Sequence, residues 1–157
     1  MATRTGALRG TASTTGYAAL PTKAVYTQTF EFDIAKDITA NGAIASADII
    51  NLIPIPDNTL LYVNGVINGS ALVLGTSGVV ELGDNSDDDR FVANQTTTTA
   101  GAAATIEAVG QTGYTYTAAD TLSLKLSNSG GTITSGKLWI TVTMIDLNAV
   151  ADGKPSF

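Results

Sequence analysis

Two segments in the last third of the chain alternate apolar and polar residues, and this alternation constrains the fold most strongly. Residues 121–127, TLSLKLS, alternate leucine with Thr, Ser and Lys, and residues 137–147, KLWITVTMIDL, alternate in a similar way. A period of two is typical of a β-strand with one buried face. The residues expected on the two buried faces are Leu122, Leu124, Leu126, Leu138, Ile140, Val142 and Met144. Trp139 falls on the opposite face, where we expect it to pack against a loop or a neighbouring subunit.

The same period recurs in AVYTQTFEFD, residues 24–33, and other short apolar runs separated by turn residues follow it. No segment keeps a period of 3.6 residues, so long amphipathic helices are not expected. About eight strands without alternating helices predict an all-β fold, an antiparallel β-sandwich of the jelly-roll type. We expect this domain to span residues 24–150.

Several connections can be predicted from turn residues. KDITANGAIASAD, residues 36–48, is expected to be a turn-rich connection, and residues 71–82 have the spacing of a hairpin. Asn128-Ser129-Gly130-Gly131 is expected to form a tight turn. Pro54 and Pro56 require a strand edge, a strand end or a bulge, because proline has no backbone donor. Asn64-Gly65 is compatible with a bulge or a turn.

The two ends of the chain differ from the predicted sandwich. Residues 1–23 lack any usable period and carry the basic residues Arg4, Arg9 and Lys23 before the first acidic residue, Glu31. Such a segment cannot bury enough apolar surface to fold alone. It is therefore expected to be either a disordered tail or an extended N-terminal arm that orders on an acidic partner. Residues 151–157 are expected to be a C-terminal tail.

The composition argues against most kinds of catalysis. The chain of 157 residues contains no histidine and no cysteine, which excludes Ser-His-Asp and Cys-His catalysis and every metal site built on those ligands. Neither a GxxxxGK[ST] nor a GxGxxG motif is present. We therefore expect no enzymatic activity and no cofactor. The formal net charge of −6 disfavours binding to nucleic acid, and the sequence has no apolar segment long enough for a membrane span or a secretory signal.

The stretch LGDNSDDDRF, residues 82–91, concentrates four acidic residues: Asp84, Asp87, Asp88 and Asp89. Read as an EF-hand loop from Asp84, the stretch has Asp where glycine is required at position six and Gln where Glu is required at position twelve, so an EF-hand is excluded. A looser Ca²⁺ site remains a weak candidate. The simpler interpretation is an acidic surface loop that faces solvent or a basic neighbour, with Arg90 at its rim and Phe91 returning to the core.

Three segments taken together resemble a known pattern: ADIINLIPIPDNTLLYVNGVI, VVELGDNSDDDRFVA and KLWITVTMIDL. Their order is similar to that of small β-sandwich proteins from the head gene clusters of tailed bacteriophages, which are known as capsid decoration, cement or head-stabilising proteins. The resemblance covers roughly residues 24–147. In this chain Asn85-Ser86 stands where that family commonly has a glycine.

The resemblance implies a virion structural protein that binds the outside of a phage capsid, is made in the host cytoplasm and has the major capsid protein and copies of itself as partners. It further implies homotrimers and an N-terminal arm laid over the capsid shell. The residues expected at interfaces are Arg4, Arg9, Lys23, Asp87, Asp88, Asp89, Arg90 and Trp139. One alternative is another virion β-module, such as a head fibre, tail or receptor-binding piece, that recognises glycans through Trp139 and the pair Tyr114/Tyr116. A second is a non-viral extracellular carbohydrate-binding or adhesin domain.

Overall fold

The structure, a computed structural model, describes residues 3–5, 8–9 and 25–148. Ten strands and two short helices occur in this part of the chain. The strands are β1 (Thr3–Thr5), β2 (Leu8–Arg9), β3 (Val25–Asp33), β4 (Asp48–Ile55), β5 (Thr59–Val73), β6 (Val79–Gly83), β7 (Val92–Gln95), β8 (Tyr114–Tyr116), β9 (Asp120–Ser127) and β10 (Ser135–Asp146). The helices are α1 (Ile34–Asn41) and α2 (Ala108–Thr112). None of the helices in the described residues is long and apolar enough to cross a membrane.

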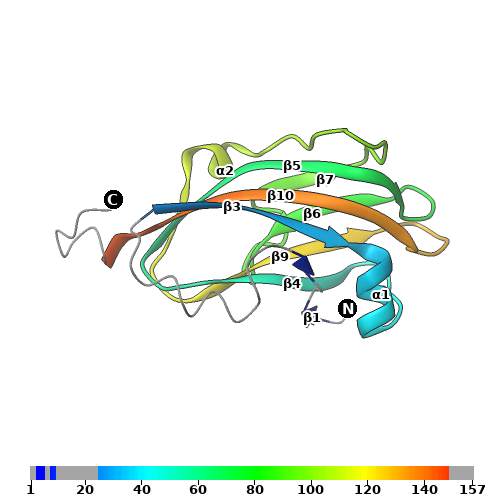
Figure 1. Cartoon of the computed structure of the whole chain (residues 1–157), viewed down its shortest axis with the longest axis horizontal. Helices are drawn as coiled ribbons and strands as arrows, with labels where there is room; N and C mark the ends of the chain where they lie inside the picture. The colour runs from blue at the N-terminus through cyan, green and yellow to red at the C-terminus, as the bar shows by residue number, and fades with distance from the viewer. Residues whose placement is uncertain (1–2, 6–7, 10–24, 149–157) are drawn as a thin grey trace.

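The strands form two sheets that pack face to face (Figure 1). Sheet A has the order β1-β4-β9-β6-β7, and sheet B has the order β2-β3-β10-β5-β8. Apart from β1 and β2, each sheet contains four strands with antiparallel pairing. Counted from β3, the first, eighth, third and sixth strands make one sheet, and the second, seventh, fourth and fifth make the other. This is the jelly-roll arrangement, so the predicted all-β, antiparallel sandwich is confirmed.

The core lies between the two sheets and contains the residues that the alternation placed there. All seven apolar residues predicted on the buried faces of the last two long strands, β9 and β10, have 0% of their surface exposed. Along β3, Phe30 and Phe32 are buried as well, whereas Thr27 and Thr29 are exposed. Phe91 returns to the core directly after the acidic loop, as predicted.

One connection predicted as a hairpin and one predicted as a tight turn both carry the chain from one sheet to the other. Residues 71–73 belong to β5 in sheet B, whereas β6 lies in sheet A, so residues 71–82 are not a hairpin. Residues 128–131 likewise join β9 of sheet A to β10 of sheet B. The two crossings contact each other, because the backbone N–H of Thr76 donates to the carbonyl of Gly130 at 2.7 Å. The turn residues therefore predicted where the chain reverses, but they did not predict which sheet the next strand belongs to.

The predicted turn-rich connection over residues 36–48 is wrong in its first half, because α1 occupies residues 34–41. Asp33 caps this helix by accepting a hydrogen bond from the backbone N–H of Lys36 at 3.2 Å. Gly42, with a φ of 88°, ends it, and its N–H donates to the carbonyl of Ile38. The Asn41-Gly42 pair thus terminates a helix of two turns, which is too short to show a sustained period.

Irregularities in the strands account for the remaining predictions. Asn64 is a bulge, since Thr141 and Val142 of β10 pair with Gly65 and Val63 of β5 and leave Asn64 between them. Pro54 lies in β4 beyond the residues that pair with β1, 49–51, and next to the register shift between Asn51 and Ile53.

Candidate functional site

The acidic loop, residues 84–90, connects β6 to β7 and folds back tightly on itself. The backbone N–H of Asp84 donates to the carbonyl of Asp87 at 2.8 Å, and the N–H of Phe91 donates to the carbonyl of Leu82 at 2.9 Å. A side chain at Gly83 would collide with the backbone of Asp87 and Asp88. Glycine at position 83 therefore allows the loop to return this close to the end of its own strand.

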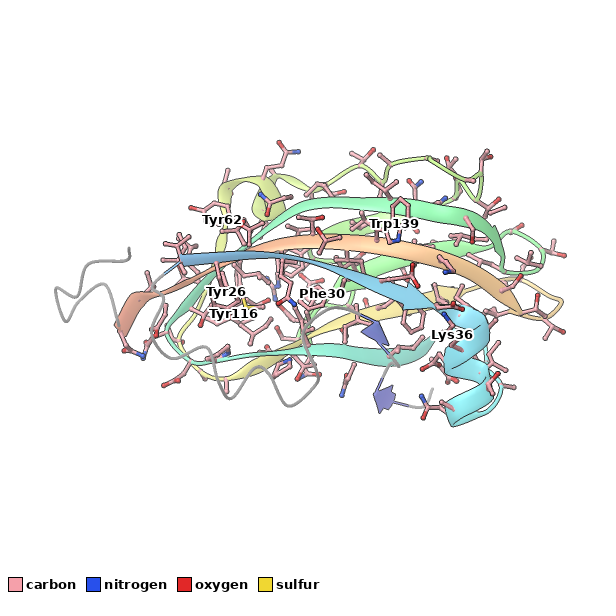
Figure 2. All side chains as sticks on the ribbon, viewed as in Figure 1. Tyr26, Phe30, Lys36, Tyr62, Tyr116 and Trp139 are labelled. Atoms are coloured by element: carbon pink, nitrogen blue, oxygen red, sulfur yellow. The ribbon has the colours of Figure 1, made fainter. Side chains whose placement is uncertain are left out.

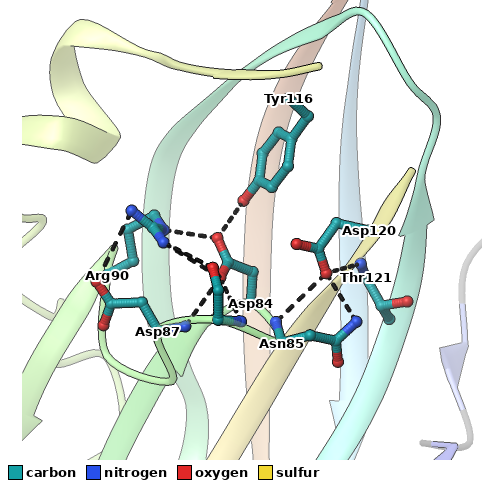
Figure 3. Close-up of polar contacts among 8 residues, drawn as sticks. Asp84, Asn85, Asp87, Arg90, Tyr116, Asp120 and Thr121 are labelled. Atoms are coloured by element: carbon teal, nitrogen blue, oxygen red, sulfur yellow. Dashed lines mark hydrogen bonds and ion pairs between the residues drawn. The ribbon is translucent and has the colours of Figure 1, made fainter. Parts of the chain in front are cut away.

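Asp84 does not face solvent, which corrects the prediction for the first residue of the loop. Its side chain is fully buried and contacts Ser86, Arg90 and Tyr116, and we call these four residues the Asp84 cluster. Figure 3 shows Asp84 with Arg90 and Tyr116. Arg90 Nε donates to Asp84 Oδ2 at 2.6 Å, and the Tyr116 hydroxyl donates to the same oxygen at 2.7 Å. The other oxygen, Oδ1, accepts from the backbone N–H groups of Ser86 and Asp87, both at 3.0 Å, and from Ser86 Oγ at 2.8 Å.

The interactions within the Asp84 cluster keep Asp84 and Arg90 ionised. Burial alone would raise the pKa of Asp84, but the hydrogen bonds from Arg90, Tyr116 and Ser86 outweigh burial and lower it. Burial, followed by the hydrogen bond to Asp84, raises the pKa of Tyr116, so the phenol keeps its proton. The guanidinium of Arg90 also lies over the ring of Tyr114, 4.1 Å from the ring centroid. Arg90 is thus part of a buried network rather than a free basic group at the rim.

A carboxylate with this many donors is suited to holding a loop, not to moving protons. A general acid or base needs a pKa brought near the working pH and an open position beside the reacting atom. Asp84 has neither, because its pKa is lowered and both oxygens are occupied by protein donors. The cluster therefore fixes the shape of the acidic loop and ties it to β8 of the opposite sheet.

The remaining acidic residues of the loop lie nearer the surface. Asp88 forms an ion pair with Lys125 of β9 at 2.8 Å, and Lys125 also pairs with Glu81 of β6 at 2.7 Å. Asp87 lies 3.7 Å from Arg90, and its side-chain hydrogen bond with Asp89 raises the pKa of Asp89. Arg90 occupies Asp84 and lies near Asp87, and Lys125 occupies Asp88, so cations already neutralise candidate Ca²⁺ ligands. Within the part of the chain that the structure describes, no group of three or more acidic side chains could hold a metal ion.

Trp139 lies on the outer face of sheet B and is 44% exposed (Figure 2). Its indole rests on Gly69 of β5, where a Cβ atom would lie only 2.8 Å from the ring. The indole N–H donates to Glu31 of β3 at 3.3 Å, and Glu31 pairs with Lys137 at 3.2 Å. The hydrogen bond from Trp139 is the leading cause that lowers the pKa of Glu31. The ring is therefore held against the sheet with one side turned to solvent.

Threonine side chains continue this outer face along β3 and β10. Thr29 and Thr141 hydroxyls are 2.8 Å apart, and those of Thr27 and Thr143 are 2.7 Å apart. Each pair joins directly opposed residues of the two strands. The hydroxyl of Thr143 also donates to Asn64 Oδ1 at 2.9 Å. The face is thus a row of uncharged hydroxyl and amide groups beside an exposed aromatic ring.

Two of the three predicted basic contacts at the N-terminus lie in strands. Arg4 is in β1, opposite Ile50 of β4, and Arg9 is in β2, opposite Glu31 of β3. Lys23 lies outside the described residues. The predicted N-terminal arm therefore contributes two short strands, one to each sheet.

The sequence did not predict the contacts that complete these sites. Tyr116, which the glycan-binding alternative grouped with Tyr114, is buried and its hydroxyl donates to Asp84. Its distance of 32 residues from Asp84 left no local signal for this contact. Gly69 and Glu31, which position Trp139, come from two other strands and could have been found only by predicting the strand register.

Comparisons with known proteins support the fold alone. No family model matches the chain, and no curated protein matches it. Two solved structures contain similar chains, one from the capsid asymmetric unit of cyanophage Pam1 and one from the capsid of Ralstonia phage GP4. The first match has a TM-score of 0.54 at 18% identity and covers 77% of this chain and 84% of that chain. The second has a TM-score of 0.54 at 17% identity and covers 78% and 84%.

Proposed function

We propose that this protein is a structural component of a phage virion, a decoration or cement protein that binds the outside of the head and stabilises it through subunit contacts. The observation that carries the proposal is the jelly-roll fold shared with chains of two phage capsid structures, over 77–78% of this chain and 84% of each of theirs. Coverage of this extent means that the likeness involves most of the chain and not one motif.

The described residues fit a role in assembly. The most deeply buried ion pair, Asp84 with Arg90, belongs to a cluster that is saturated with internal hydrogen bonds and holds a loop in shape. That loop presents Asp87, Asp88 and Asp89 at the surface, where they could meet a basic partner. The neighbouring charges of Asp87 and Asp88 contribute to the raised pKa of Asp89, and a basic partner would relieve this repulsion. We propose the major capsid protein and further copies of this chain, in a homotrimer, as the partners.

The test is binding of the purified full chain to heads assembled without it, followed by co-sedimentation at low and high salt. The chain should bind, and the heads should then resist heat to a higher temperature. Changing Asp87→Asn, Asp88→Asn and Asp89→Asn together should weaken binding most at low salt, where charges are least screened. A control variant, Asp57→Asn with Glu107→Gln, removes two exposed carboxylates outside the loop and should bind normally.

A chain that stays monomeric and does not sediment with heads at any salt concentration would overturn the proposal. Equal binding by the triple variant and the unchanged protein would leave the head assignment intact but remove the acidic loop from the contact surface. Mass measurement of the free protein separates monomer from trimer in the same preparation.

A further inference from the structure

The outer face of sheet B is unusual in a chain with a net charge of −6, because its centre carries no net charge. We call this surface, made by the outward residues of β3, β10 and β5, the Trp139 face. Its charged members in the described residues near Trp139 are Glu31 and Asp33 of β3 and Lys137 of β10, which pair with one another and with Lys36. Arg9 of β2 lies opposite Glu31 at the edge of the sheet. Thr141 and Ile67 lie beside Trp139 along and across the strands. A surface of this kind offers no electrostatic attraction to an ionic partner and favours a neutral one.

The position of the Trp139 indole further limits the kind of ligand that this face can bind. Trp139 lies flat over Gly69 and is fixed there by its hydrogen bond to Glu31. A side chain lying flat cannot insert into a pocket of a protein partner, as the aromatic anchors of protein interfaces do. It presents instead one side of a π-system, whose negative potential attracts the slightly positive C–H groups of a ligand. The flat C–H face of a pyranose ring is the neutral ligand group that matches this shape and charge.

A second aromatic residue stands on the same face. Tyr62 of β5 is the register partner of Thr143, four residues beyond Trp139 along β10, or about 13 Å at the rise of a strand. The tyrosine ring covers Gly113, as Trp139 covers Gly69. Figure 2 shows the two labelled rings at separate points along the sheet. Between them run Thr141 and Thr143, whose hydroxyls can donate to and accept from the hydroxyls of a sugar.

The far end of this path is a groove. A cavity of about 340 Å³ lies between β5 and α2 and is lined by Tyr62, Val63, Asn64, Ile106, Gly110 and Gln111. Its volume falls within the range of small-ligand sites. An aromatic ring together with the amides of Asn64 and Gln111 gives the groove one apolar wall and hydrogen-bonding groups of both kinds.

We propose that the Trp139 face binds a neutral polysaccharide, with one sugar ring stacked on Trp139 and the chain running past Thr141 to the groove at Tyr62. A nucleic acid could also stack on an aromatic ring, but its phosphates would need several unpaired cations, and Lys36 and Lys137 are already paired with Glu31 and Asp33. The inference does not depend on the proposed role on the phage head. It would give the molecule a saccharide-binding surface in addition to any contact with a capsid.

Trp139 is the only tryptophan of the chain, so its fluorescence reports on this face alone. The full-length protein is titrated with hexasaccharides of glucose, mannose, xylose and N-acetylglucosamine, and run in native gels that contain the corresponding neutral polysaccharides. At least one sugar should change the emission saturably and retard the protein. Trp139→Ala should weaken the retardation roughly tenfold or more, and Trp139→Phe should retain most of it, because a ring remains. Tyr62→Ala should remove the contact at the far end of the sugar chain. It should therefore weaken the binding of long oligosaccharides more than the binding of short ones.

Val73→Ala serves as the control, because Val73 is an exposed apolar residue of β5 at 49% exposure that pairs with Ser135, on the side of Trp139 away from Thr141 and Tyr62 and so off the proposed sugar path. It should leave binding unchanged. Trp139 is half exposed, so its substitution should leave the protein folded. Thermal melts of the variants check that a loss of binding does not come from unfolding. The proposal is overturned if no sugar changes the emission and no polysaccharide retards the protein. It is also overturned if the emission responds to assembled heads and to no sugar, which would make Trp139 a protein contact.

Discussion

The outer surfaces of the two sheets are built from different chemistry. On sheet A, Glu81 and Lys125 form a charged pair across neighbouring strands, and the acidic loop adds Asp88 to it. Sheet B has a charged group at one end, where Glu31 and Asp33 pair with Lys137, but beyond Trp139 the outer positions of β3 and β10 are threonines that pair through neutral hydroxyls. On the sheet A side, charged side chains hold the acidic loop in place. On the sheet B side, the threonine rows carry no charge and their surface is exposed. The sheet A side should therefore determine stability, and the sheet B side should tolerate change and be free for binding.

The largest effect is expected from Asp84→Asn. The substitution leaves the Arg90 guanidinium without its buried counter-ion and places an amide N–H₂ group against other donors. Removing one partner of a buried ion pair typically costs about 3–5 kcal/mol of unfolding free energy. Chemical denaturation followed by circular dichroism measures this loss.

Asp88→Asn is the control, because the Asp88 side chain is 36% exposed and Lys125 keeps Glu81 as a partner. An exposed pair contributes up to about 1 kcal/mol. If Asp84→Asn and Asp88→Asn lost similar amounts of unfolding free energy, the buried carboxylate would contribute no more to stability than the exposed one. The proposed difference between the two parts of the loop would then be wrong.

The second prediction concerns acid. The folded-state pKa of Asp84 is lowered, so the unfolded chain takes up its proton first, near its ordinary value of about 4. The stability contributed by Asp84 is therefore complete above that value and is lost as the pH falls through the lower folded-state pKa. The raised pKa of Asp89 acts in the opposite direction, but its carboxylate is near the surface and solvent screens it.

Denaturation curves between pH 7 and pH 2.5 isolate the contribution of Asp84 when the unchanged protein is compared with Asp84→Asn. The difference in stability between them should shrink below about pH 4. A difference that stays constant down to pH 2.5 would mean that the pKa of Asp84 is not lowered by folding.

The sequence predicted the faces of the strands well and the contacts between distant segments poorly. Alternation identified the buried residues of β9 and β10, because one face of each strand packs in the core whichever strand lies beside it. The burial of Asp84 was missed because four acidic residues close together in the sequence resemble a solvated turn. Tyr116, which covers and hydrogen-bonds Asp84, comes from the opposite sheet and gave no local signal. The helix α1 was missed because its two turns depend on a cap at Asp33 and a stop at Gly42 more than on a period.

The smallest effect is expected on the Trp139 face. Thr143→Val removes the hydroxyl that contacts Thr27 and Asn64 but keeps the β-branched shape that suits a strand. Cross-strand pairs of this kind contribute roughly 0.2–1 kcal/mol, so the variant should lose less than about 1 kcal/mol of unfolding free energy. Its thermal midpoint, measured beside that of Asp84→Asn, should lie close to the midpoint of the unchanged protein. A loss as large as that of Asp84→Asn would mean that the threonine rows stabilise the sandwich as strongly as the buried charges do, and the neutral face would then be a structural requirement and not a surface free for binding.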